Sequence, residues 1–285
     1  MLLSRSIVLV VLLTASTLVT GANTAAPAIS GKKGVGVWPY PGLTAALREI
    51  DVSWYYNWRP APPDDAPEGI EFVPMIWDET YVTDKHLAAA RVSGSTLLGF
   101  NEPDHHKQAD MTVAQALELW PRLEATGMRL GSPASASGAA NPDSWFGCFM
   151  SEAEARGYRI DFICVHRYER TFDDPEGGAL DLENFLTRVY ERYQKPLWLT
   201  EFALSNWKEP AAAEQQEAYL KAVVPMLERL PFVERYAWFA LPPNETGDGG
   251  ALVSASLSAQ DGTLNALGAA YQQSGRTASA PASAR

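Results

Sequence analysis

Two glutamates follow apolar stretches of similar shape. Residues 96–100 lead into Asn101 and Glu102, and residues 196–200 lead into Glu201. Each stretch predicts a buried strand that presents a glutamate at its carboxyl end. A carboxylate in that position usually serves chemistry rather than packing. Because Glu102 and Glu201 lie far apart in the sequence, only the fold can bring them together.

Two carboxylates that face one cleft can hydrolyse a glycosidic bond. One must be protonated, so that it can donate to the leaving oxygen, and the other must be ionised, so that it can attack the anomeric carbon. On this hypothesis Glu102 and Glu201 are the catalytic residues. The alternative is that each glutamate pairs with an arginine or lysine at the rim of the fold. Two such glutamates on suitable strands, one preceded by Asn101, favour catalysis.

Several further side chains are candidates for substrate binding. Asn101 could hydrogen-bond a sugar 2-hydroxyl, or it could simply cap the end of the strand. His166 and Tyr168 close another predicted strand and share its facing, so they could contact the sugar, orient a carboxylate or form a buried pair. Tryptophan rings stack on the apolar faces of sugars. Candidates at predicted strand ends are Trp58, Trp77 and Trp238, with Trp38, Trp54, Trp198 and Trp207 nearby, and any one of them could instead pack in the core.

Alternating strand and helix patterns predict how these residues are positioned. Strands are expected at 34–38, 52–58, 72–77, 97–101, 130–134, 160–168, 197–202 and 236–241. We therefore predict an α/β fold, a single compact (β/α)8 TIM barrel with a short or missing second helix. Active sites in such barrels lie at the carboxyl ends of the strands. Glu102 on strand four and Glu201 on strand seven would then share one opening.

Two helix starts carry local signals. Thr112 followed by Gln115 predicts a capping box that opens a helix. Asn141 before Pro142 predicts another helix start, with the asparagine as cap and the proline in the first turn.

The termini are expected to lie outside the catalytic domain. Arg5 precedes an apolar run and then small uncharged residues, which predicts a signal peptide over residues 1–25. A retained membrane anchor is the weaker alternative. The barrel is assigned to 31–273, close to the ~250 residues typical of the fold. Residues 274–285 are small and polar, and we expect a flexible tail.

Composition narrows the choice of partner. The chain has 285 residues, 46% of them hydrophobic, and a net charge of −11. That charge disfavours nucleic acid or an anionic membrane surface and allows a neutral substrate. Cys148 and Cys164 lack metal-site spacing and could be a disulfide or two free thiols. His105 and His106 are adjacent on a loop, which disfavours a metal site. We expect no cofactor, no metal and a monomer.

The motifs together resemble glycoside hydrolase family 128, with a glycosyl hydrolase catalytic core. The resemblance spans residues 34–271. It rests on Trp54-Tyr55-Tyr56-Asn57-Trp58, Leu98-Gly99-Phe100-Asn101-Glu102-Pro103-Asp104, Gly131-Ser132-Pro133-Ala134, Asp161-Phe162-Ile163 with Val165-His166, Trp198-Leu199-Thr200-Glu201-Phe202, and Asp261-Gly262-Thr263-Leu264 with Leu267-Gly268 and Tyr271.

This resemblance implies a secreted or periplasmic retaining endo-β-1,3-glucanase that acts on laminarin- or curdlan-like chains. Glu102 would match the family's acid/base and Glu201 its nucleophile. One departure is Arg167, which stands where the family often has tryptophan. The alternatives are a retaining glycosidase for another β-linked polysaccharide such as xylan or mannan, and a β-glucan-binding protein without turnover.

Overall fold

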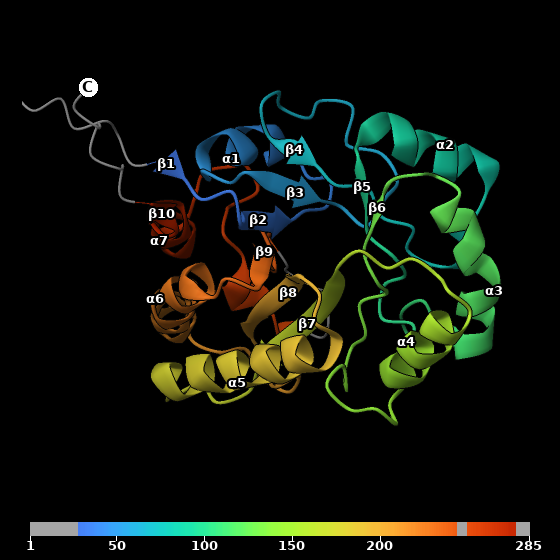
Figure 1. Ribbon diagram of the computed structural model, residues 1–285. Coiled ribbons are helices and arrows are strands. Elements are labelled where there is room, and N and C mark those ends of the chain that lie inside the picture. The colour runs from blue at the N-terminus through green and yellow to red at the C-terminus, as the bar shows by residue number, and fades with distance from the viewer. Residues whose placement is uncertain (1–27, 244–249, 278–285) are drawn as a thin grey trace, which may run out of the picture.

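The computed structural model describes residues 28–243 and 250–277. The predicted signal peptide, residues 1–25, lies outside this part of the chain. Figure 1 shows helices arranged around a central set of strands. The prediction of an α/β barrel is confirmed.

Eight parallel strands of the described chain form the barrel. They are β2 (Lys33–Gly36), β3 (Trp54–Tyr56), β4 (Glu71–Phe72), β5 (Thr96–Leu97), β6 (Arg129–Leu130), β7 (Ile163–Glu169), β8 (Leu197–Leu204) and β9 (Val233–Trp238). Six of them form one sheet in the order β4-β3-β2-β9-β8-β7, and β5 pairs with β6. Parallel bridges from Met75 to Leu98 and from Gly131 to Phe162 join the two sheets, which closes the ring.

Helices follow most strands and cover the outside of the ring. They are α1 (Leu43–Glu49), α2 (Asp84–Ser93), α3 (Val113–Glu124), α4 (Trp145–Ala155), α5 (Pro175–Tyr193), α6 (Ala213–Arg229) and α7 (Ala266–Gln273), with the short 3₁₀ helices η1 (Glu79–Tyr81) and η3 (Val253–Ala255). The described segment between β3 and β4 contains no helix, as the sequence predicted.

Three of the strands are short, and prolines follow two of them closely. β4, β5 and β6 each contain two residues; Pro74 follows β4 by two residues and Pro133 follows β6 by three. Proline has no N–H to donate to a strand ladder, so the ladder there is reduced to single bridges. The chain is consequently irregular at the ends of these strands.

One of the two helix-start predictions is confirmed. Thr112 and Gln115 form the predicted capping box at the start of α3. The prediction for α4 is wrong: Asn141 and Pro142 precede the helix, and Ser144 is its N-cap. The Ser144 hydroxyl accepts from the N–H of Gly147 at 3.0 Å, so a serine two residues beyond the proline caps this helix.

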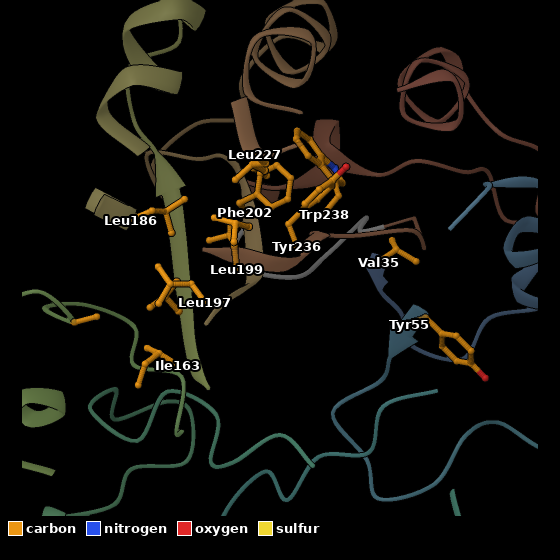
Figure 2. Packing of buried hydrophobic residues seen from close by; sticks show 14 of the residues in the cluster. Val35, Tyr55, Ile163, Leu186, Leu197, Leu199, Phe202, Leu227, Tyr236 and Trp238 are labelled. Atoms are coloured by element: carbon orange, nitrogen blue, oxygen red, sulfur yellow. The ribbon is translucent and has the colours of Figure 1, made fainter. Parts of the chain in front are cut away.

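Buried side chains form two layers. Outward-facing residues of the strands pack against the helices, as Leu199 and Phe202 of β8 do with Leu227 of α6 (Figure 2). A second cluster fills the inside of the ring and includes Trp54 and Trp198. The alternation of strand side chains produces this division.

Glycine on β2 makes room for the inner tryptophans. A Cβ added to Gly34 would lie 2.3 Å from the ring of Trp54, and one added to Gly36 would lie 3.0 Å from Trp58. Aromatic side chains of β3 can therefore extend over β2 into the interior. A side chain at position 34 or 36 would exclude these rings.

The chain ends of the described region meet. β10 (Arg276–Thr277) pairs antiparallel with β1 (Ala28–Ile29). The predicted flexible tail is therefore wrong for residues 276 and 277, because they have a strand partner that the local composition did not reveal. Residues 278–285 lie outside the described part.

We predict that Gly34→Ala destabilises the fold by about 1–3 kcal/mol, the usual cost of overpacking a full core. The added methyl would overlap the fully buried Trp54 ring. Denaturant unfolding measures this change. Gly31→Ala is the matched control, since nothing lies within 4 Å of the added atom. Equal stability of the two variants would contradict the packing described here.

Candidate active site

The segment that follows β5 places two successive polar side chains toward the same opening. Glu102 has φ +45°, a left-handed conformation that costs a non-glycine residue on the order of 1–3 kcal/mol. Its N–H donates to Ala134 O at 2.7 Å, and its carbonyl accepts from His105 N at 3.0 Å. These bonds hold the turn, so that both Asn101 and Glu102 line the cleft.

A β-bulge turns Glu201 toward the interior. Trp198 faces inward and Leu199 outward, so strict alternation would place Glu201 outside. The register of β8 shifts against both neighbouring strands at this point, and His166 pairs with Glu201. The extra residue, Thr200, reverses the facing of the residues after it.

His166 lies between the two glutamates. Its Nδ1 is 2.8 Å from Glu102 Oε1 and 3.4 Å from Glu201 Oε2, and its side chain is 1% exposed. One ring nitrogen of His166 and one carboxylate oxygen of each glutamate lie within 4.8 Å of one another. Because the short Nδ1–Oε1 contact is a hydrogen bond, the cluster is built to hold and move a proton.

Glu201 is held by aromatic donors. Tyr168 donates its hydroxyl to Oε2 at 2.7 Å, and Trp58 donates Nε1–H to Oε1 at 3.0 Å. Glu102 differs, since no hydrogen bond from any described residue reaches its second oxygen. Glu201 is thus fixed as an acceptor, while one oxygen of Glu102 remains available to a ligand.

The pKa values of the three groups are set by burial and by His166. Burial raises the pKa of the Glu201 carboxyl above its usual value, and the charge of Glu102 raises it further. His166, Tyr168 and Trp58 lower this pKa, but not enough to cancel the rise. Burial also acts to raise the pKa of Glu102, but the hydrogen bond and charge of His166 outweigh it and leave that pKa lowered. Burial opposes the charge on His166, yet the carboxylates raise its pKa overall.

A cleft of about 1080 Å³ opens above these groups. It contains seven of the eight candidate residues named from the sequence: Trp58, Trp77, Asn101, Glu102, His166, Tyr168 and Glu201. The aromatic residues Trp38, Trp207 and Phe239 also line it. Of these, Phe239 was not singled out from the sequence, and its position next to Trp238 was the available signal.

The prediction that Trp238 binds substrate is wrong. Its ring is fully buried in the outer layer, and its Nε1–H donates to Ala255 O at 2.8 Å. Trp238 is the last residue of β9 and faces the helices, while the next residue, Phe239, faces the cleft. That prediction rested on the residue type, because tryptophan often stacks on sugars, and it did not take into account which face of the strand Trp238 occupies.

Two other sequence questions are answered by position. Arg167 stacks over Phe185, with 5.5 Å between guanidinium and ring centre, and lies 3.8 Å from Glu169. It reaches the side of the cleft rather than the glutamates.

Cys148 and Cys164, both in described segments, are free thiols, so the disulfide alternative is wrong.

Comparison with known proteins identifies this arrangement. The model of the glycosyl hydrolase catalytic core family matches residues 37–271. A crystal structure of a subgroup I endo-β-1,3-glucanase of family 128 from Amycolatopsis mediterranei, bound to laminaripentaose, is 44% identical, covers 86% of this chain and 100% of its own, and has a TM-score of 0.79. The chain belongs to glycoside hydrolase family 128. The resemblance noted in the sequence is confirmed.

Other similarities are more distant. A family 128 subgroup III curdlan-specific exo-β-1,3-glucanase from Blastomyces gilchristii is 29% identical, with coverage of 85% of this chain and 98% of that one and a TM-score of 0.68. Alkali-sensitive linkage protein 1 of Schizosaccharomyces pombe is 28% identical over 254 residues, which is 85% of this chain. The chain described here spans 44% of the length of that curated relative.

We predict that Glu201→Gln stabilises the fold at neutral pH. The folded-state pKa of Glu201 is raised, so stability is lost as the pH rises from the ordinary glutamate pKa through the raised one. Glutamine carries no charge and removes this cost. The thermal midpoint should rise at pH 7 by roughly 2–4 °C for each kcal/mol relieved, and the gain should vanish near pH 4.

The matched control is Glu209→Gln, which changes an exposed glutamate outside the cleft and should leave the midpoint unchanged. A lower midpoint for Glu201→Gln at pH 7 would mean that the fold stabilises this carboxylate, contrary to the pKa shift.

Proposed function

We propose that this protein is a retaining endo-β-1,3-glucanase that cleaves laminarin- or curdlan-like chains by double displacement. Glu102 is the acid/base and Glu201 the nucleophile. The single observation that carries the proposal is the placement of Glu102, His166 and Glu201 within 4.8 Å at the bottom of an aromatic cleft. Family membership and the 44% identity to an endo-β-1,3-glucanase support the linkage and the mode of attack.

The spacing of the carboxylates supports retention. Retaining enzymes separate their carboxyl groups by ~5–5.5 Å, and inverting enzymes need a wider gap for a water molecule. One oxygen of Glu102 lies within 4.8 Å of one oxygen of Glu201, which agrees with the narrower spacing. That separation leaves the second carboxylate close enough to attack the sugar directly.

The hydrogen bonds support the division of roles. Tyr168 and Trp58 donate to both oxygens of Glu201, which favours a carboxylate over a carboxylic acid. They also hold the carboxylate in one orientation. The second oxygen of Glu102 accepts no hydrogen bond from the described residues, and from the cleft it can protonate the leaving oxygen.

The lowered pKa of Glu102 in the resting site depends on a proton held by His166. When that proton moves from Nδ1 to Oε1 along the 2.8 Å hydrogen bond, the stabilising positive charge disappears. Burial and the negative charge of Glu201 then favour the protonated acid. Formation of the glycosyl-enzyme neutralises Glu201, after which Glu102 can act as the base for the incoming water.

The cleft surface suits a neutral sugar chain. Asn101 is 3% exposed, and its Oδ1 has no partner among the described residues, so it can accept from the 2-hydroxyl. We propose that Trp58 and Trp77 provide sugar-facing rings, and that His166 and Tyr168 contact the sugar held between the glutamates.

We also propose that the mature protein is secreted after removal of residues 1–25 and acts as a monomer. The sequence pattern of those residues supports export. In the described part of the chain, none of the helices is long and apolar enough to cross a membrane. One chain supplies both glutamates and the cleft, which supports a monomeric enzyme.

Product analysis on laminarin and curdlan tests this proposal. We expect the wild type to release a ladder of laminari-oligosaccharides from both, as internal cleavage requires. Glu102→Gln should lower kcat/KM by about 10²–10⁴, the usual contribution of a general acid, and Glu201→Gln should abolish turnover. Glu209→Gln serves again as the control with unchanged rate. Release of glucose alone would indicate exo attack, and cleavage only of a β-1,4-linked polymer would refute the linkage.

A further inference from the structure

The bulge that orients Glu201 is held by a hydrogen bond from a strand across the barrel. Thr200 lies in β8 where the register shifts against both neighbours. Its carbonyl oxygen accepts the hydroxyl of Tyr56 at 2.8 Å. Tyr56 belongs to β3, which pairs with β2 and β4 and not with β8. The bond therefore crosses the barrel interior instead of following the sheet, where β2 and β9 separate the two strands (Figure 1).

Small residues on the intervening strands make this crossing possible. Gly34 and Gly36 of β2 lie against the aromatic side chains of β3, and Ala237 of β9 belongs to the same inner cluster. A Cβ on Gly36 would already be 3.5 Å from the Tyr56 ring. The Tyr56 side chain is fully buried, so its hydroxyl has to find its partner inside the protein.

The hydroxyl has one proton, and its geometry assigns that proton to the backbone. Thr200 O is at 2.8 Å, whereas Glu201 Oε1 is at 3.4 Å. Trp58 already donates to the same Oε1 at 3.0 Å. Tyr56 therefore acts on Glu201 chiefly through the peptide that precedes it, and not as a direct donor to the carboxylate.

We infer that Tyr56 is a positioning residue for the nucleophile, holding the Thr200 bulge so that Glu201 points at the anomeric carbon. The inference rests on the proposed function, because it assigns Tyr56 a part in the attack by Glu201. Without this bond the bulge keeps its extra residue but loses the contact that fixes its carbonyl. The preceding peptide then turns more freely, and the carboxylate leaves its attack position for part of the time.

Tyr56→Phe tests the inference, with Tyr55→Phe as the matched control. Tyr55 is the neighbouring buried tyrosine on the outer face of the same strand. Laminarin and an activated aryl β-laminaribioside are both assayed. A misplaced nucleophile slows attack on both substrates, whereas a defect at the acid is relieved by a good leaving group.

We expect Tyr56→Phe to lower kcat by about ten- to hundredfold on both substrates, the scale of a misplacement near 1 Å. KM should stay within about twofold, and Tyr55→Phe should keep the wild-type kcat. An unchanged kcat, or a loss seen with laminarin and absent with the aryl glycoside, would overturn the inference.

A crystal structure of Tyr56→Phe provides a readout that does not require activity. We expect a displaced Thr200 peptide and a changed Glu201 side chain, with the barrel otherwise unaltered. If the wild type cleaves no β-1,3-glucan, the proposed function fails, and this structure still decides whether Tyr56 positions Glu201. An undisturbed bulge and carboxylate in the variant would refute the positioning role.

Discussion

Two carboxylates buried side by side repel each other, and the surrounding structure compensates for this repulsion. His166 reaches both glutamates with one nitrogen, and Tyr168 and Trp58 donate to the more buried carboxylate. Burial of unpaired charge would otherwise cost several kcal/mol. The same compensation divides the chemistry, because the fully bonded carboxylate is oriented for attack and the other keeps an oxygen free.

Backbone irregularity is concentrated where the chemistry takes place. Glu102 adopts a left-handed conformation after β5, and Thr200 forms a bulge in β8. Phe100 before the first and Leu199 and Phe202 around the second are buried in the outer apolar layer. The Tyr56 hydroxyl then links the bulge to the opposite side of the ring. A rigid ring with local distortions is the expected way to fix a site within a few tenths of an ångström.

The alternation of strand and helix patterns along the sequence, and the residues that end them, predicted the barrel and its missing helix. They also predicted that Glu102 and Glu201 share one opening. They could not predict the reversal at Thr200, because a bulge depends on the register of neighbouring strands. Alternation alone would have turned Glu201 outward. For Trp238 the error was the opposite, since its residue type suggested a sugar platform while its facing placed it among the helices. Tyr56 was not singled out from the sequence, because the partner of its hydroxyl is a carbonyl far along the chain.

The central claim is that Glu201 forms the covalent bond to the sugar. A 2-deoxy-2-fluoro-β-laminaribiosyl fluoride should trap the glycosyl-enzyme. The fluorine at C2 slows both formation and breakdown of the intermediate, while the fluoride leaving group speeds formation alone, so the intermediate accumulates. Peptide mass spectrometry locates the label. The account predicts one label per chain, on the peptide that contains Glu201. A label on Glu102, or rapid turnover to an inverted product with no labelled peptide, would contradict it.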